Sequence, residues 1–332
     1  MVRLTFATPD PSRRWIRVRR PSIAGLGRYG TVLGLIVMIA VFSFLKPETF
    51  PTWSNFLTIF DDTSLLAIVA GGLTVCLILN EFDLSIGFTV TLGGIIATQW
   101  LDSGLGVPES VLIGLAAGLL VGLVNGLVVT QFGVSAFIAT LATGAVINGI
   151  IIFITGGQPN TVLPPGFSAI GQSTLVTISS PVLIAVGVLI LLWTFLNRTE
   201  GGRRIDATGG NTKAARFAGI RVNRYRMLGF VISALCAALA GVVLAARLGA
   251  GYTDAGNAYL LDAFTACFLG AVTFHDGRFN ILGTLVGVLI LAVTFNGLNQ
   301  LGVPSYWQDI VKGLILIFAV AGSGVARGFS TR

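Results

Sequence analysis

Eight polar side chains lie in or beside the apolar runs of this sequence, where they have the chemistry to contact a polar solute. Ionisable groups inside a membrane segment are costly and usually functional, and side-chain amides offer hydrogen-bond donors and acceptors to hydroxyl groups. A structural role fits the same residues, because carboxylates and hydroxyls cap helices and amides join neighbouring helices. The candidates for a path through the membrane are Asn80, Glu81, Asp83, Ser85, Asp262, Asn296, Asn299 and Gln300.

Motifs for catalysis and metal binding are absent from the sequence. His275 is the only histidine, which excludes HExxH and two-histidine metal sites, and there is no GxSxG segment. The three lysines follow Leu45, Thr212 and Val311 rather than glycine, so the chain lacks a Walker A phosphate loop. We therefore predict no catalytic residues, no metal site and no cofactor in this chain.

The composition predicts an all-α, polytopic membrane helix bundle. Hydrophobic residues make up 54% of the chain and charged residues 11%, whereas an ordinary soluble domain is about 25% charged. The 43 glycines suit helices that pack closely in a membrane. All three cysteines fall in apolar runs and are expected to be buried thiols. Ten spans are predicted: Arg28–Leu45, Ser64–Leu79, Gly87–Leu101, Ser110–Thr130, Ser135–Thr155, Pro181–Leu196, Met227–Arg247, Asp262–Thr273, Asn280–Asn299 and Trp307–Gly322.

Basic residues gather in three segments that orient these spans. Seven arginines lie in residues 1–29, eight lysines or arginines lie in 198–226, and two arginines lie near the C-terminus. Such clusters mark the cytoplasmic side of a membrane protein and do not indicate nucleic-acid binding. Six and four predicted spans separate the segments, and both numbers are even. We predict a cytoplasmic N-tail at 1–29, a transmembrane domain at 30–322 and a cytoplasmic C-tail at 323–332.

Residues 197–226 form the one long polar stretch between apolar runs, here called the basic segment. Its centre, GGNTKAARFAGI at 209–220, predicts a short amphipathic helix with Asn211 as N-cap and Gly219 as the helix stop. An exposed cytoplasmic helix needs a partner, and our hypothesis is an ATPase. The alternative is a basic surface loop attracted to anionic lipid.

Three further features have local interpretations. Polar residues interrupt the apolar sequence at Leu77–Gly87 and at Thr273–Asn280, which predicts broken helices that line a polar cavity. The uncharged stretch 156–178 is expected on the outer side, either as an inert connection or as a contact for a soluble partner. Lys312 lies in the last apolar run and is expected to pair with Asp309 at i−3.

Four segments of this chain resemble the permease subunit of bacterial ABC importers for monosaccharides, of the ribose, galactose and xylose type. EFDLSIG at 81–87 resembles "GIDLSVG", SAFIATLATGAVINGI at 135–150 resembles "xxFIATLGTM…RG", and 209–220 resembles the coupling loop "GGNxxAAxxSGI". Residues 260–313 resemble the C-terminal third of the family almost throughout. The chain departs at residues 80–82, where many members have Gly-Gly-Ile, and at 274–276, where many have a Gly/Ser-rich stretch.

The resemblance implies a homo- or heterodimeric membrane domain in the bacterial inner membrane. It further implies a separate ATPase with two fused nucleotide-binding domains, which binds ATP and Mg, and a periplasmic or lipid-anchored sugar-binding protein. Residues expected to couple to the ATPase are Gly209, Gly210, Asn211, Ala214, Ala215, Gly219 and Ile220.

Other function classes stay open at this point. An ABC permease for a nucleoside, an autoinducer or a branched-chain amino acid shares the architecture. An ion-coupled secondary carrier needs no ATPase and would use Glu81 and Asp83 as proton or sodium sites, but it does not require the 209–220 helix. A channel or receptor subunit is a further alternative.

Overall fold

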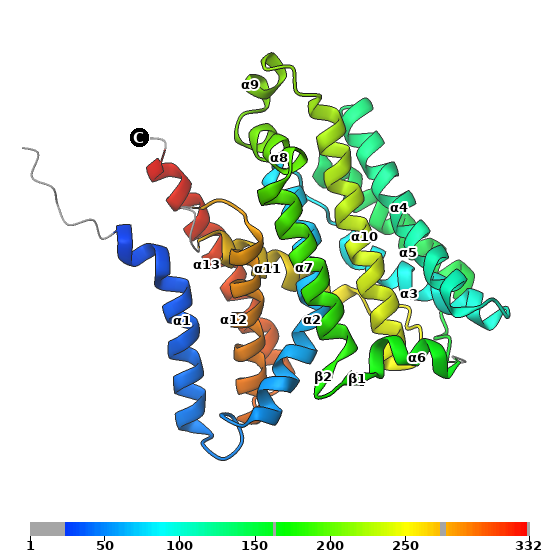
Figure 1. Cartoon of the computed structure of the whole chain (residues 1–332), viewed down its shortest axis with the longest axis vertical. Helices are drawn as coiled ribbons and strands as arrows, with labels where there is room; N and C mark the ends of the chain where they lie inside the picture. The colour runs from blue at the N-terminus through cyan, green and yellow to red at the C-terminus, as the bar shows by residue number, and fades with distance from the viewer. Residues whose placement is uncertain (1–23, 162–163, 273–276, 331–332) are drawn as a thin grey trace, which may run out of the picture.

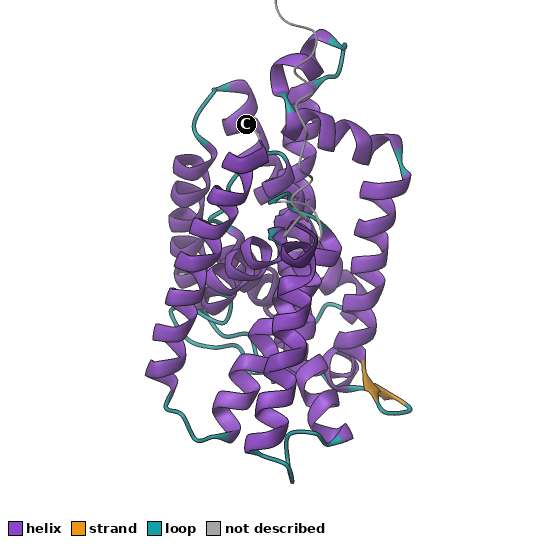
Figure 2. Cartoon of the chain, turned by 90° about the vertical axis from the view of Figure 1, so that its left-hand side faces the viewer, coloured by secondary structure: helices purple, strands orange, loops and turns teal. Residues whose placement is uncertain are grey.

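The computed structural model describes residues 24–161, 164–272 and 277–330, and they form a bundle of helices (Figure 1). Two-residue strands form one antiparallel hairpin, which Figure 2 shows at one end of the bundle. The elements are α1 (Ala24–Leu45), α2 (Trp53–Ile78), α3 (Ile86–Asp102), α4 (Val107–Gln131), α5 (Ala136–Thr155), α6 (Pro165–Gln172), β1 (Thr174–Leu175), β2 (Ile178–Ser179), α7 (Ser180–Arg198), α8 (Glu200–Gly210), α9 (Thr212–Phe217), α10 (Val222–Leu248), α11 (Asn257–Ala271), α12 (Ile281–Gln300) and α13 (Ser305–Ser330).

The predicted all-α membrane bundle is confirmed, but the predicted count of ten spans is not. Among the described residues, six helices are long and apolar enough to cross a membrane, namely α2, α4, α5, α7, α10 and α12. The other four predicted spans fall on α1, α3, α11 and α13. Of these, α3 has 17 residues and α11 has 15, and a straight crossing takes about 20.

Local sequence signals set several helix ends. The Thr52 hydroxyl accepts a hydrogen bond from the Asn55 N–H at 3.2 Å where α2 begins. The Asn280 side chain accepts one from the Gly283 N–H at 2.7 Å where α12 begins. Gly156 and Gly249 adopt left-handed backbone angles directly after α5 and α10, as is common at helix C-termini.

The centre of the bundle is α10, which packs against α2, α3 and α4. Its contact with α3 is close because both helices place glycine at the crossing. A Cβ on Gly241 would lie 1.8 Å from the Val90 carbonyl oxygen, and one on Gly94 would lie 2.7 Å from the Gly241 oxygen. Small residues bring membrane helices into contact in this way. On the other side of α2, α11 packs against α12 and α13, and α1 packs against α12.

Both interruptions that the sequence predicts are real breaks between helices. The first separates the end of α2 at Ile78 from the start of α3 at Ile86, and the second separates Ala271 of α11 from Ile281 of α12. His275 and Asp276 lie outside the described residues. The stretch 156–178, expected to be a turn-rich connection, contains α6 and β1 and leads into β2.

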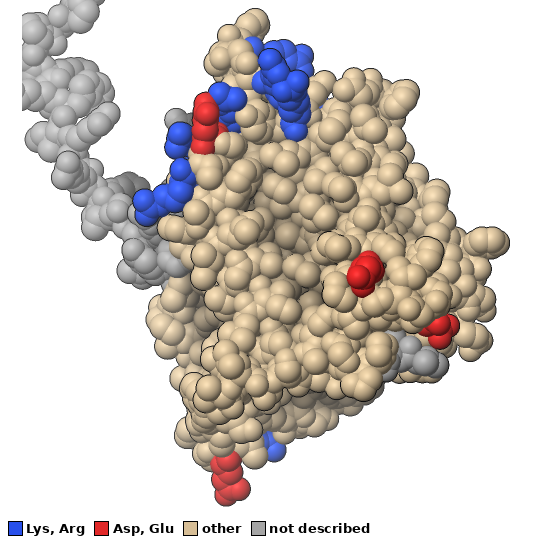
Figure 3. All heavy atoms as spheres, turned by 45° about the vertical axis from the view of Figure 1, so that its right-hand side comes forward, with Lys and Arg blue, Asp and Glu red and all other residues tan. Residues whose placement is uncertain are grey.

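The distribution of charged side chains distinguishes the two ends of the molecule. The basic segment, with α8 and α9, forms one end, and Lys and Arg side chains gather there in Figure 3. The start of α1 and the end of α13 lie toward the same end (Figure 1). By the positive-inside rule this basic end is cytoplasmic. The α1–α2 loop, α6 and the β-hairpin lie at the opposite end (Figure 1), which we call the outer end.

Candidate functional site

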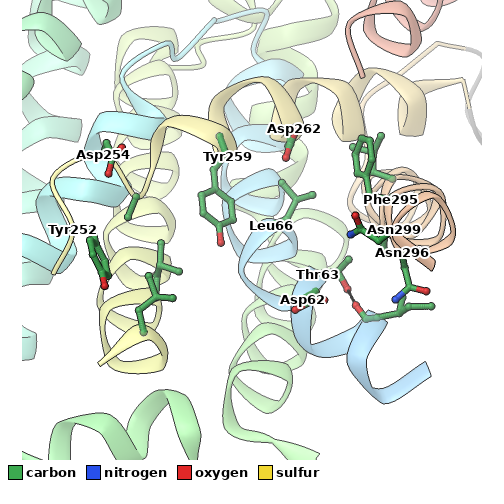
Figure 4. Close-up of a pocket in the computed structure, with 17 residues that line it drawn as sticks. Asp62, Thr63, Leu66, Tyr252, Asp254, Tyr259, Asp262, Phe295, Asn296 and Asn299 are labelled. Carbon is green, nitrogen blue, oxygen red and sulfur yellow. Dashed lines mark hydrogen bonds between the residues drawn. The ribbon is translucent and has the colours of Figure 1, made fainter. Parts of the chain in front are cut away.

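A cavity of about 470 Å³ lies between α2, α10, α11 and α12 (Figure 4). Its wall on α2 comes from the first half of that helix, whereas α8 contacts the other end of α2 through Gly209 and Ile78. The cavity therefore lies in the outer half of the molecule, away from the basic segment. It is lined by Ile59, Asp62, Thr63, Leu66, Leu244, Leu248, Tyr252, Asp254, Ala255, Ala258, Tyr259, Asp262, Leu291, Ala292, Phe295, Asn296 and Asn299.

Three of the eight predicted path residues line this cavity. They are Asp262 of α11 and Asn296 and Asn299 of α12, and Figure 4 shows them with Asp62, Tyr252, Asp254 and Tyr259, which the sequence did not single out. Carboxylates, hydroxyls and amides thus meet apolar side chains on one surface. Such a lining can hydrogen-bond a hydroxylated solute while its apolar part packs on carbon.

An ion-pair cluster forms the outer edge of the cavity. Arg247, in the last turn of α10, lies 2.8 Å from an oxygen of Asp61 and 2.7 Å from one of Asp62. Asp61 also accepts a hydrogen bond from the Ser179 hydroxyl. The cluster ties α2 to α10 and to the β-hairpin. Both Asp61 and Asp62 lie within α2, which begins at Trp53.

The predicted partner of Lys312 is wrong in part, because the nearer carboxylate comes from another helix. The ammonium lies 2.8 Å from Asp262 Oδ1 and 4.0 Å from Asp309 Oδ1. Asp309 is 78% exposed, whereas Asp262 and Lys312 are 18% and 19% exposed. The ammonium also lies 5.0 Å from the Phe295 ring centroid. The mostly buried pair between α11 and α13 is therefore the main interaction of Lys312.

Replacing Asp262 with Asn is expected to destabilise the protein by about 2 kcal/mol, between the values typical of exposed and fully buried ion pairs. The cause is the loss of the near counter-charge of Lys312. The melting temperature in detergent measures this effect. Asp309→Asn is the control and should change it little. Exchanging the charges in Asp262→Lys/Lys312→Asp should recover part of the loss, and no recovery would argue against the pair.

Asp83 lies in a buried hydrogen-bonded network beside the first helix break. The N–H and the hydroxyl of Ser85 donate to Asp83 Oδ1 at 3.1 and 2.6 Å, and the Ser233 hydroxyl donates to Oδ2 at 2.8 Å. Asn125 of α4 donates to Ser85 Oγ at 2.9 Å. Neither Asp83 nor Ser85 lines the cavity. Asp83 accepts a backbone N–H just before α3, as a capping role requires, whereas the Ser85 side chain forms no capping hydrogen bond. The network joins the break to α4 and α10.

Asn80 and Glu81 contact the basic segment instead of the cavity. Asn80 has a left-handed backbone and donates from Nδ2 to the Gly209 carbonyl oxygen at 2.7 Å. The buried Glu81 carboxylate pairs with Arg226 Nε at 2.5 Å, in the first turns of α10. Gln300 also lies away from the cavity lining, bonded to Thr49 and Asn55 near the start of α2.

The basic segment contains two helices, α8 and α9, where the sequence predicted one. Gly209 and Gly210 end α8, and a Cβ on Gly209 would lie 1.7 Å from the Ile78 carbonyl oxygen, so glycine is required there. The predicted cap is confirmed, since Asn211 Oδ1 accepts from the Ala214 N–H at 3.0 Å. Gly219 has φ +80° and follows the end of α9, as predicted.

The exposure of α9 shows which of its side chains can meet a partner. Ala214 is exposed and Ile220 is partly buried, but Ala215 is 4% exposed and faces the protein itself. Phe217, the last residue of α9, is 91% exposed. The sequence did contain a signal for it, an aromatic residue in an otherwise polar and basic helix.

Comparison with known proteins identifies the class to which this bundle belongs. Residues 55–320 match the family described as branched-chain amino acid transport system / permease component. The chain is 36% identical over 295 residues to the ribose import permease protein of Bacillus subtilis, covering 88% of this chain and 91% of that protein. It is 34% identical to the D-allose and the L-arabinose transport system permease proteins of Escherichia coli, covering 89% of this chain and 90% of each. The chain therefore belongs to the branched-chain amino acid transport system / permease component family and is a multi-pass permease of the bacterial cytoplasmic membrane.

Proposed function

We propose that this chain is the membrane-spanning subunit of an ATP-driven monosaccharide importer and forms the translocation path by alternating access. The observation that carries the proposal is the presence of two features in one chain: a cavity of mixed polar and apolar lining in the outer half, and an exposed α9 at the basic end. The relatives named for ribose, D-allose and L-arabinose support a sugar as the solute.

The cavity favours a neutral, hydroxylated solute. Its volume of about 470 Å³ falls within the range of roughly 300–1,000 Å³ that small-molecule sites occupy. Two of its three carboxylates have cationic partners, Asp62 with Arg247 and Asp262 with Lys312. The remaining charge, on Asp254, disfavours an anion. The side chains of Asn296 and Asn299 each already accept one hydrogen bond, from Gln300 and Gln308 respectively. Only part of each amide is therefore available to hydrogen-bond a hydroxyl group of the solute.

Contacts between the basic segment and the first helix break transmit movements of α8 and α9 to the helices that line the cavity. The Asn80–Gly209 hydrogen bond joins α8 to the end of α2, and the Glu81–Arg226 pair joins the same break to α10. Both α2 and α10 continue from there to the cavity wall. A shift of α8 and α9 on ATPase closure would therefore move both helices together.

The proposed partners are those that the resemblance to ABC sugar permeases implies. ATP and Mg bind to a separate ATPase with two fused nucleotide-binding domains, whose cleft receives α9. A periplasmic or lipid-anchored sugar-binding protein delivers the sugar to the outer end. A second permease copy, identical or related, completes the membrane dimer.

Replacing Asn299 with Leu is expected to lower sugar uptake about tenfold, the effect of roughly 1.4 kcal/mol in lost hydrogen bonding. Asn299 lines the cavity from the outer end of α12. Uptake of labelled ribose, D-allose and L-arabinose is measured in cells that carry the complete system. ATP hydrolysis by the purified complex should remain within about twofold of the parent. Unchanged uptake of every transported sugar would show that this cavity is not part of the translocation path.

A further inference from the structure

A second cavity, of about 300 Å³, lies at the basic end between the α7–α8 corner and the start of α12. It is distinct from the outer cavity and shares no residue with it. Its lining has an apolar part and a charged part. The apolar residues are Ile78, Leu196, Phe279 and Ile281, and the polar ones are Asn197, Arg203, Asp206, Arg278 and Asn280, with Gly202 between them.

The described lining of this cavity has two arginines, Arg203 and Arg278, and one carboxylate, Asp206. Two other arginines of the corner are engaged elsewhere, since Arg198 lies over the Trp193 ring at 5.6 Å and Arg204 contacts Glu200 and Tyr225. Among the described residues, neither Arg203 nor Arg278 forms an ion pair, although Asp206 lines the same cavity. Within this described lining, two guanidinium groups and one carboxylate give an excess of positive charge that favours an anion.

The cavity lies at the cytoplasmic end of α7. Of the six long apolar helices, α7 is the least buried, with 22% of its 18-residue apolar stretch inside the protein. This peripheral helix therefore faces lipid or another chain over most of its length. Trp193 and Arg198 mark its cytoplasmic end, where tryptophan and basic residues meet the membrane interface. Leu196 and Asn197 of the same turn line the cavity.

We propose that this cavity binds the headgroup of an anionic phospholipid of the cytoplasmic leaflet. The phosphate lies between Arg203 and Arg278, and the glycerol and upper acyl carbons cover Leu196 and Ile281. Basic pockets between membrane helices on the cytoplasmic side bind acidic headgroups for these reasons. The lipid would bridge α8 and the start of α12, which both line this cavity.

Native mass spectrometry of the full chain in mild detergent, titrated with phosphatidylglycerol or phosphatidylcholine, tests the site. The parent should bind one phosphatidylglycerol at least about tenfold more tightly than phosphatidylcholine, since each basic group contributes about a fivefold gain for an anionic lipid. Arg203→Gln/Arg278→Gln should weaken that binding about 25-fold. Asp206→Asn removes the opposing carboxylate and should strengthen it. This gain cannot arise from misfolding.

Arg198→Gln is the matched control, because Arg198 is a basic residue of the same corner outside the cavity. It should leave the affinity for phosphatidylglycerol within about twofold of the parent. Equal binding of the two lipids, or a double arginine variant that retains the affinity of the parent, would overturn the proposal. Displacement of the lipid by inorganic phosphate at millimolar concentration would also overturn it, by assigning the site to a soluble anion.

Discussion

Replacing Phe217 with Asp is expected to lower ATP-driven sugar uptake by about tenfold or more, because buried aromatic anchors typically contribute at least 2 kcal/mol to an interface. Phe217 is 91% exposed at the end of α9. A large apolar side chain in this position has no role in the fold of the single chain. In the proposed function this ring is buried in a cleft of the ATPase, and a carboxylate would oppose that burial.

Uptake in cells and the amount of ATPase that co-purifies with the tagged chain measure this effect. Both should fall together in Phe217→Asp, while the amount of chain in the membrane stays the same. Phe217→Tyr retains the ring and should keep most of the activity. If Phe217→Asp transported sugar at the rate of the parent, α9 would not be the coupling element.

A substitution at Ala215 cannot separate an effect on docking from an effect on folding. Ala215 is among the residues expected to couple to the ATPase, but its side chain is 4% exposed and faces the permease itself. A tryptophan at this position would displace α9 from its own chain. Loss of uptake in Ala215→Trp would therefore not distinguish a damaged cleft contact from a misplaced helix, whereas Phe217→Asp does.

Replacing Gly241 with Val is expected to prevent normal assembly of the bundle, at a cost of about 3 kcal/mol or more from overpacking. The first added carbon would lie 1.8 Å from the Val90 carbonyl oxygen, so the backbones of α10 and α3 must separate. Because α10 also packs against α2 and α4, the displacement spreads through the centre of the protein.

Size-exclusion profiles and melting temperatures in detergent measure this prediction. Gly187→Val is the matched control, since Gly187 lies on α7 and a Cβ there would have no neighbour within 4 Å. The control should elute and melt like the parent, whereas Gly241→Val should aggregate or melt far lower. Equal behaviour of the two variants would contradict the close α3–α10 crossing.

Features that depend on a few neighbouring residues could be predicted from the sequence. Apolar runs located the helices, and clustered arginines gave them a common orientation. The break after α2 followed from Asn80, Glu81 and Asp83 between apolar runs, and the start of α9 followed from Asn211 as a cap. Helix formation, capping and insertion are local events, so the local sequence contains their signals.

Features that depend on distant residues could not be predicted. Asn80 and Glu81 have the polar character of path residues, yet they bond to Gly209 and Arg226. Lys312 has a local carboxylate at i−3 but lies nearer to Asp262. Arg247 pairs with Asp61 and Asp62, about 185 positions earlier. Tertiary packing decides among such partners, and a single sequence does not contain the pairing.

The most direct test of the proposed function is to purify the tagged chain from its native membrane in mild detergent and to identify the proteins that accompany it. The account predicts an ATPase with two nucleotide-binding domains, and sugar uptake by the reconstituted assembly that requires ATP. A chain that purified alone and catalysed ion-driven uptake in liposomes without ATP would contradict it, and would identify the protein as a secondary carrier.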